Sequence, residues 1–228
     1  MPSKKTLLGK NNLSIIFLGR SGAGKGTQLA LLKNKLNLYE IDSGSLLRNF
    51  VKQKNPLALN INKIISDGKL VPTWLVVYLW LKTLLNIKSE KGVIFEGSPR
   101  RLEEAKILEE SLNIMQRKFI VIYLNVSEKE VIRRLLLRRI CVKCGREYSL
   151  EFNPNLTHCP KCGGKLVKRS DDNLKAIKHR LEYFRKDIIP VINYFRKKKL
   201  LIEINGEGSI KEVHERIIKS LNKYLKIK

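Results

Sequence analysis

A glycine-rich segment that ends in a lysine is the first feature of the chain able to bind a phosphate group. Residues 19–28 read GRSGAGKGTQ and follow the apolar run at residues 13–18, LSIIFL. Glycines at this spacing can adopt positive φ, so that successive backbone N–H groups point at one anion. Lys25 can then reach the terminal phosphates, and a helix starting near Gly26 directs its positive end at them. The pattern predicts a nucleotide-binding loop, with the hydroxyl of Thr27 one position later than usual.

All four cysteines of the chain fall within one short segment. Cys141, Cys144, Cys159 and Cys162 form the pattern C-x2-C-x14-C-x2-C, and a glycine follows each pair. This spacing is typical of a structural zinc site, in which four thiolates leave no coordination position open for catalysis. Disulfide bonds are the alternative interpretation, which a cytosolic location disfavours. His158 is adjacent to the third cysteine and could replace a thiolate, although a surface position is the simpler expectation for it.

The length of 228 residues and the hydrophobic content of 43% are those of a globular protein with one substantial core. No apolar run is long enough to span a bilayer, and the basic N-terminus lacks the apolar core of a signal peptide. We therefore expect a cytoplasmic protein without a membrane partner. The net charge of +25 raises the alternative of nucleic-acid binding. Because the few aromatic residues do not alternate with the basic runs, we instead expect a solvated surface that attracts anionic substrates.

Alternating strands and helices must position these groups. Nearly continuous apolar runs predict the strands of a buried parallel sheet at residues 14–18, 38–41, 93–95, 119–125 and 200–204. Helical periodicity predicts helices at residues 26–36, 45–51, 72–85, 101–112, 129–138 and 209–225. This alternation indicates an α/β fold. A further helix is predicted from Leu174 to Ile188, with Pro190 kinking or ending its first part.

Several motifs in the same order make the chain resemble the nucleoside monophosphate kinase family, specifically adenylate kinases with a zinc-binding lid. The resemblance extends from about residue 13 to residue 221 and includes GRSGAGKGTQ, with Ser21 in place of the usual proline. Further matches are IDSGSLLR at residues 41–48, GKLVP at residues 68–72, EGSPR at residues 96–100, the acidic pair Asp171 and Asp172, and the loop Asn205-Gly206 with Gly208.

The resemblance implies a P-loop NTPase-type three-layer core with a central parallel five-stranded sheet. It assigns residues 13–41, 73–138 and 171–228 to this core domain. Residues 42–72 then form a monophosphate-binding insertion, residues 139–170 form a zinc-ribbon lid, and residues 1–12 form an N-terminal tail. The implied reaction is the reversible transfer of the γ-phosphoryl group of Mg-ATP to AMP, giving two ADP. The expected partners are these small nucleotides, bound by a monomer, with Mg²⁺ accompanying ATP, a structural Zn²⁺ in the lid and no nucleic acid.

The resemblance also implies the site residues, because phosphoryl transfer requires positioning and charge neutralisation. The catalytic residues are Lys25, Arg100, Arg138, Arg169 and Arg180. The donor nucleotide is bound by Gly22, Ala23, Gly24, Lys25, Gly26, Thr27, Arg134 and Gly208. AMP is bound by Ser43, Arg48, Lys69, Val71, Gly97, Arg100, Glu104, Arg169 and Arg180. The zinc ligands are Cys141, Cys144, Cys159 and Cys162.

Besides Ser21, three positions depart from the family pattern. Glu96 replaces the usual aspartate near the magnesium waters, Ser98 replaces an aromatic residue, and Glu104 replaces the glutamine that pairs with adenine. An ionised carboxylate only accepts hydrogen bonds, which suits the two donors of guanine and leaves adenine N1 opposite an acceptor. One alternative is therefore a kinase with relaxed or altered acceptor base, such as GMP. A more remote alternative is a basic zinc-ribbon ATPase that binds nucleic acid.

Overall fold

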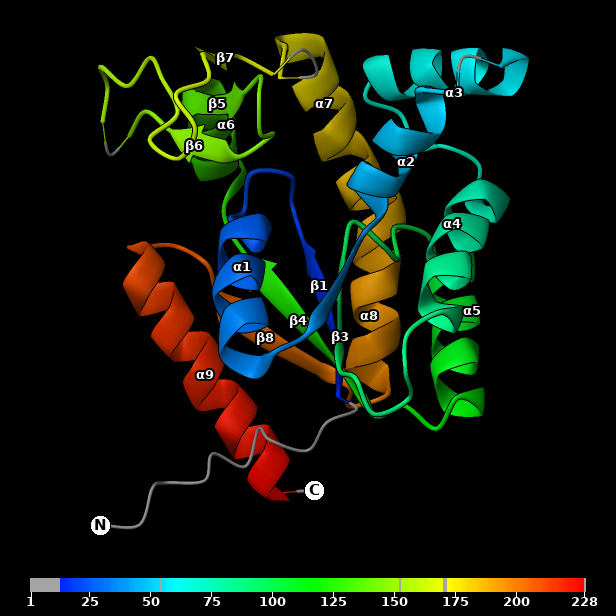
Figure 1. The fold of residues 1–228 in the computed structure, drawn as a ribbon. Coiled ribbons are helices and arrows are strands. Elements are labelled where there is room, and N and C mark those ends of the chain that lie inside the picture. The colour runs from blue at the N-terminus through cyan, green and yellow to red at the C-terminus, as the bar shows by residue number, and fades with distance from the viewer. Residues whose placement is uncertain (1–12, 54, 152, 170–171, 228) are drawn as a thin grey trace.

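The computed structural model describes residues 13–53, 55–151, 153–169 and 172–227. The tail expected at residues 1–12 and the predicted Asp171 lie outside the described residues. A parallel five-stranded sheet with the strand order β2-β3-β1-β4-β8 forms the centre of the molecule (Figure 1). Its strands are β1 (Ser14–Gly19), β2 (Tyr39–Asp42), β3 (Val93–Glu96), β4 (Phe119–Asn125) and β8 (Leu201–Asn205). The prediction of a central five-stranded parallel sheet is confirmed.

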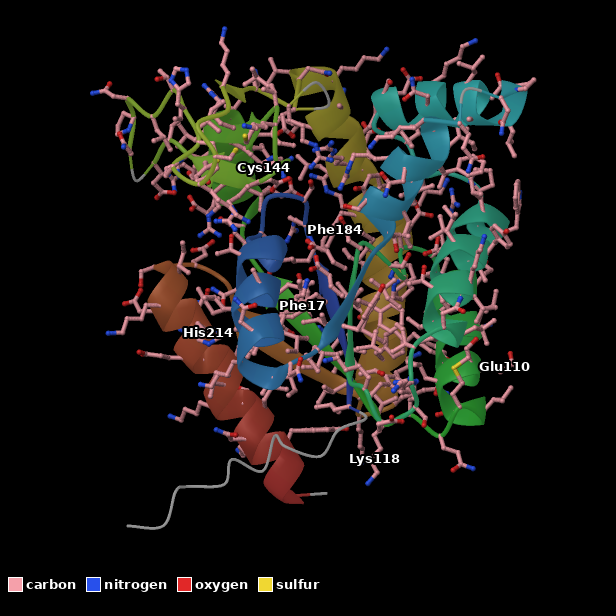
Figure 2. The ribbon with its side chains drawn as sticks, in the orientation of Figure 1. Phe17, Glu110, Lys118, Cys144, Phe184 and His214 are labelled. Atoms are coloured by element: carbon pink, nitrogen blue, oxygen red, sulfur yellow. The ribbon has the colours of Figure 1, made fainter. Side chains whose placement is uncertain are left out.

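Helices cover both faces of this sheet and complete three layers (Figure 1). One face carries α1 (Lys25–Leu36) and α9 (Ile210–Ile227), and the other carries α4 (Thr73–Leu85), α5 (Leu102–Ile114) and α8 (Ile189–Lys197). Because side chains alternate along a strand, β1 serves both layers. Ile15 and Phe17 pack with the cluster of α1 and α9, whereas Ile16 and Leu18 pack with that of Trp80 on α4. Phe17 lies inside the molecule, whereas Glu110 and Lys118 project at its edge (Figure 2).

Two segments leave the sheet on the side of its carboxyl ends (Figure 1). Between β2 and α4 the chain forms two short helices, α2 (Ser43–Val51) and α3 (Pro56–Ser66), and α2 includes the helix predicted at residues 45–51. After α6 (Glu128–Leu137) it forms an antiparallel sheet of β5 (Arg138–Cys141), β6 (Glu147–Ser149) and β7 (Leu166–Val167), in the order β6-β5-β7. Cys141, Cys159 and Leu166 form a separate small core there.

The helix predicted at Leu174–Ile188 requires a correction. It consists of α7 (Leu174–Tyr183) followed by one π-helical segment at Phe184–Ile188, and α8 follows without a break. Pro190 lies in the first turn of α8, and because it has no N–H it leaves the preceding π-helical turn without one backbone donor. The irregularity therefore precedes the proline. No helix in the described part of the chain is long and apolar enough to cross a membrane.

Candidate active site

The phosphate-binding loop lies between β1 and α1. Gly22 and Gly24 adopt φ of 85° and 88°, which side-chain-bearing residues rarely do. Gly24 is the N-cap of α1, and no side chain among the described residues caps this end, so its N–H groups are available to an anion. Ala23 is buried, whereas Gly26 and Thr27 are exposed on the first turn of α1. The loop thus has the conformation that the sequence predicts.

Lys25 folds back onto its own loop. Its Nζ donates to the carbonyl oxygens of Gly19 at 3.0 Å and Arg20 at 2.9 Å. Desolvation by burial is the main cause that lowers the pKa of Lys25 to about 8; the charge of Glu96 opposes this shift, and the charges of Arg100 and Arg138 contribute to it. Arginines from two other segments of the chain thus influence the charge state of this one ammonium group.

Glu96, at the carboxyl end of β3, lies beside the first turn of α1. A Cβ atom at Gly26 would be 3.4 Å from its Oε2, so glycine leaves room for this carboxylate. Desolvation raises the pKa of Glu96 to about 7, and the positive charge of Lys25 counteracts this shift. The loop lysine and this acid are therefore an interacting pair whose protonation changes near neutral pH.

A second group of cations surrounds the N-terminus of α2. A Cβ atom at Gly97 would lie 3.5 Å from Arg100 Nη2, Gly44 N and Ser43 Cβ, so these groups face one another. The buried Ser43 Oγ has no hydrogen-bond partner among the described residues. Arg48 donates to Ser45 Oγ at 2.6 Å. The carboxylate of Asp42 caps this helix end through Gly44 N and Ser45 N and lies 3.2 Å from Arg48 Nη2. A phosphate group that replaced this carboxylate would meet two arginines, the helix N-terminus and the Ser43 hydroxyl.

The residues predicted to flank an acceptor base lie at differing depths. Val71 is buried, and its carbonyl oxygen accepts a hydrogen bond of 2.7 Å from Arg101 Nη1. Lys69 is exposed and its Nζ lies 3.1 Å from Asp67, so its side chain is directed to solvent rather than to the arginines. The sequence analysis missed Arg101, although its position directly after EGSPR is a signal that could have found it.

Glu104 is buried in the first turn of α5, with 2% of its surface exposed. Its Oε2 accepts hydrogen bonds from the backbone N–H of Arg100 at 2.8 Å and from Ser98 Oγ at 3.4 Å. Burial raises the pKa of Glu104, and the hydrogen bond from Arg100 acts in the opposite direction. One carboxylate oxygen is thus used to hold the loop that carries Arg100.

The remaining predicted arginines come from the elements around the small antiparallel sheet. Arg138 and Arg180 both bind the carboxylate of Asp172, which is completely buried. Arg180 Nη1 is also 3.4 Å from Ser21 Oγ in the phosphate-binding loop. Arg169 Nη1 lies 2.9 Å from Glu147 Oε1, an acidic partner that the sequence analysis did not identify.

Arg134 connects the phosphate-binding loop with the loop after β8. Its guanidinium group binds Glu130 at 2.7 Å and donates to the carbonyl oxygens of Gly206 at 3.3 Å and Ala23 at 3.4 Å. Gly208 follows with φ of 102°, and a Cβ atom there would be 2.8 Å from Glu212 Oε2. The predicted donor-side residues Ala23, Arg134 and Gly208 therefore border the same region.

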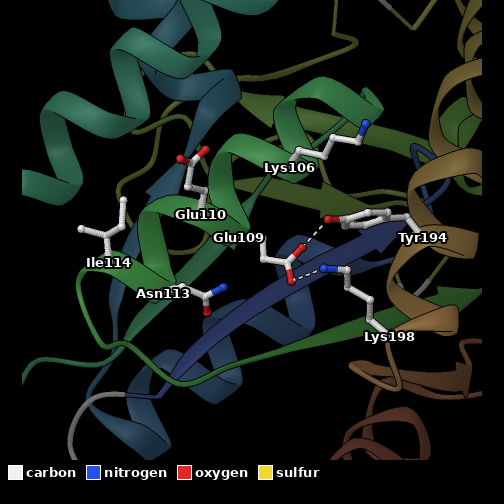
Figure 3. A pocket seen from close by; sticks show the side chains of 7 residues that line it. All are labelled: Lys106, Glu109, Glu110, Asn113, Ile114, Tyr194 and Lys198. Atoms are coloured by element: carbon white, nitrogen blue, oxygen red, sulfur yellow. Dashed lines mark hydrogen bonds and ion pairs between the residues drawn. The ribbon is translucent and has the colours of Figure 1, made fainter.

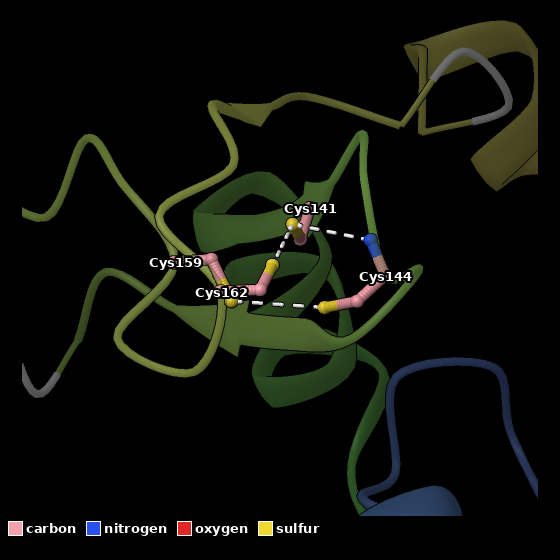
Figure 4. A group of neighbouring side chains, drawn as sticks. All are labelled: Cys141, Cys144, Cys159 and Cys162. Carbon is pink, nitrogen blue, oxygen red and sulfur yellow. Dashed lines mark hydrogen bonds between the residues drawn. The ribbon is translucent and has the colours of Figure 1, made fainter.

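The four cysteine sulfur atoms lie within 4.8 Å of one another (Figure 4). The Sγ separations of 3.5 Å for Cys141–Cys162 and 3.7 Å for Cys144–Cys159 are too long for disulfide bonds, so the cysteines are free thiols. His158 is exposed, contacts Thr157 and is not part of this group. Four clustered thiols are a donor set that suits zinc, and the residues present therefore fit such an ion.

A separate hollow between α5 and α8 contains none of the predicted site residues (Figure 3). There Glu109 accepts hydrogen bonds from Tyr194 and from Lys198, the latter at 2.7 Å. Glu109 and Lys198 thus neutralise each other and connect α5 with the end of α8.

Comparison with known proteins gives a consistent result. The family model described as "Adenylate kinase" matches residues 17–200. The adenylate kinase of Methanocella arvoryzae is 40% identical over 88% of this chain and 94% of its own length. Those of Methanothrix thermoacetophila and Chlamydia trachomatis are 34% and 35% identical, each over 93% of this chain and over 100% and 91% of their own lengths.

Proposed function

The chain belongs to the adenylate kinase family, and from this premise we propose that it transfers the γ-phosphoryl group of Mg-ATP reversibly to AMP, giving two ADP. The observation that carries this proposal is the arrangement of arginines at the phosphate-binding loop. Asp172 holds both Arg138 and Arg180, and Arg180 Nη1 lies 3.4 Å from Ser21 Oγ of this loop. Arg100, beside the N-terminus of α2, and Arg138 also lower the pKa of Lys25. A donor and an acceptor phosphate would meet among these cations.

We assign the donor nucleotide to the phosphate-binding loop. The backbone N–H groups of residues 22–27 and the ammonium group of Lys25 would hold the β- and γ-phosphates. To do so, Lys25 exchanges its hydrogen bonds to the Gly19 and Arg20 carbonyl oxygens for phosphate oxygens. Arg134 and Gly208 would border the adenine. Mg²⁺ would accompany ATP, with Thr27 and Glu96 near its water ligands.

We assign the acceptor monophosphate to the other group of cations. Ser43, Arg48 and Arg100 would bind its phosphate, and Gly97 permits their close approach. The backbone around Lys69 and Val71, together with Glu104, would flank the base. The acceptor phosphate is already ionised at neutral pH, so that the reaction requires no general base. Arg138, Arg169 and Arg180 would close over the transferred group, neutralise its charge and exclude water.

We propose a structural Zn²⁺ bound by Cys141, Cys144, Cys159 and Cys162, because four thiols leave no open position for a substrate. We assign residues 139–170 to a lid that closes over the nucleotides and residues 42–72 to the monophosphate-binding insertion. The remaining described residues form the core. We further propose that the protein is cytoplasmic, since free thiols are typical of a reducing compartment. We also propose that it is a monomer.

A coupled assay of ADP formation tests the proposed reaction. Purified protein with Mg-ATP is expected to form two ADP per AMP consumed. The turnover with AMP as acceptor is expected to be higher than the turnover with GMP, CMP or UMP. Hydrolysis of ATP without dependence on AMP would contradict the proposal. Salt-dependent binding to nucleic acid without ADP formation would favour the alternative of a nucleic-acid-binding ATPase.

A further inference from the structure

A carboxylate lies between two of the arginines that we assign to the transferred phosphoryl group. Glu147, on β6, has Oε1 2.9 Å from Arg169 Nη1 and Oε2 3.4 Å from Arg138 Nη1. Each of its two oxygens thus faces a different arginine. A phosphate group offers the same arrangement of anionic oxygens to two guanidinium groups.

The second carboxylate in this cluster has a different character. The Asp172 side chain has 0% exposed surface and binds Arg138 at 2.6 Å and Arg180 at 2.9 Å. The Glu147 side chain is 46% exposed, and each arginine contacts it with one nitrogen. Breaking a buried pair leaves an uncompensated charge, whereas an exposed pair is readily exchanged for another anion. Asp172 is therefore a permanent partner of Arg138, and Glu147 is an exchangeable one.

The charge of Glu147 also reaches the phosphate-binding loop. It raises the pKa of Lys25 and that of Glu96, although neither residue is in contact with it. A negative charge at this position thus lies in the electrostatic field of the cations that would receive the nucleotide phosphates. A bound polyphosphate and an ionised Glu147 would repel each other across the site.

We propose that Glu147 is an internal counter-anion that takes the place of a nucleotide phosphate between Arg138 and Arg169 until nucleotide displaces it. This inference rests on the proposed function, because it takes the displacing group to be the polyphosphate of a donor nucleotide. Glu147 lowers the affinity for nucleotide, since the polyphosphate must first release both arginines from it. On product release it re-forms the two ion pairs and promotes dissociation.

The test compares Glu147→Gln with Glu151→Gln. Glu151 follows β6 in the same small domain and is paired at 2.7 Å with Arg133, which is not part of the proposed site. Both variants remove one negative charge, but only the first removes the carboxylate between Arg138 and Arg169. Dissociation constants are measured for ATP and for inorganic tripolyphosphate, which has no base. Glu147→Gln is expected to bind both ligands about 3- to 10-fold more tightly. The dissociation constants of Glu151→Gln are expected to equal those of the unaltered protein.

The sign of the effect separates this proposal from a structural role. If Glu147 only orients the arginines, its removal weakens binding, which would overturn the proposal, as would unchanged affinity. Equal tightening in Glu151→Gln would assign the effect to net charge and would also overturn it. Glu147→Ala is expected to give the same sign as Glu147→Gln, and thermal melting verifies that each variant is folded. Failure of the unaltered protein to form ADP from ATP and AMP would instead refute the proposed function.

Discussion

Arg138 binds the carboxylate of Asp172 through two parallel hydrogen bonds, 2.7 Å from Nε and 2.6 Å from Nη2. Asp172 is fully buried, and its Oδ1 also accepts a hydrogen bond of 2.9 Å from Arg180. One carboxylate therefore fixes arginines that come from β5 and α7, two elements separated by the segment that carries the four cysteines. Guanidinium groups fixed in this way are already ordered before a phosphate arrives, which reduces the entropic cost of binding it.

Asp172→Asn is expected to lower both stability and turnover. The substitution leaves two partly desolvated guanidinium groups opposite a neutral amide, and loss of one partner of a buried ion pair costs about 3–5 kcal/mol. Urea unfolding measures this loss, and kcat in the ADP-forming assay is expected to fall with it. Glu182→Gln is the control, because Glu182 forms an exposed pair with His179 at 3.4 Å. An unaltered free energy of unfolding in Asp172→Asn would show that the pairing is not structural.

The core of the fold is predictable because its signals are local. The five buried strands are short apolar runs, and each observed strand differs from its predicted range by one residue at most at either end. The strands β6 and β7 of the small antiparallel sheet have three and two residues, which is too short for any periodicity. Their pairing depends on contacts around the cysteine cluster, which only the folded chain provides.

The same distinction applies to the candidate site. Lys25 and the cysteine pairs are recognisable because spacing along the chain alone brings their groups together. Glu147 is different, since its partner Arg169 is 22 residues away and meets it only through the lid sheet. The π-helical segment that starts at Phe184 is also a tertiary feature. The ring of Phe184 stacks on Tyr123 of β4, and the guanidinium carbon of Arg20 lies 4.3 Å from the ring centroid.

The activity is expected to depend on pH through the pair of Lys25 and Glu96. The value of kcat/KM reports on the free enzyme, in which the pKa of Lys25 is about 8. As the pH rises above this value, the lysine loses the proton that neutralises phosphate, and kcat/KM for Mg-ATP is expected to fall about tenfold per pH unit. The negative charge of Glu96 raises the pKa of Lys25, so Glu96→Gln is expected to shift this fall to lower pH.

Glu203→Gln is the control for this shift. Glu203 is an exposed carboxylate on β8 that pairs with Arg196 at 2.9 Å and is not among the main groups that shift the pKa of Lys25. Its profile of kcat/KM against pH is expected to coincide with that of the unaltered protein. If Glu96→Gln moved the alkaline fall of kcat/KM to higher pH, the proposed interaction between Lys25 and Glu96 would be wrong.

Loss of a zinc ligand is expected to affect stability more than chemistry. Cys141 is 1% exposed and belongs to the small core of the lid, so Cys141→Ser removes both a ligand and a core contact. Metal analysis is expected to find stoichiometric zinc in the unaltered protein and less in the variant, with a clear decrease in Tm. Turnover at low temperature is expected to change little. Val142→Ala, in the exposed turn beside it, is the control; a variant with normal Tm and lost turnover would indicate a catalytic metal.

Glu104→Gln is expected to improve AMP as an acceptor. In Glu104 the Oε2 atom already accepts the N–H of Arg100 at 2.8 Å, and the ionised Oε1 can offer adenine only an acceptor. A glutamine keeps the bond to Arg100 through its carbonyl oxygen and presents an amide N–H to adenine N1. One additional hydrogen bond is worth about 0.5–1.5 kcal/mol, so kcat/KM for AMP is expected to rise about 2- to 10-fold, while that for GMP falls. Glu103→Gln, on the exposed side of the same helical turn, is the control. If Glu104→Gln raised kcat/KM for AMP and for GMP by the same factor, the side chain would act on the loop that carries Arg100 and not on the base.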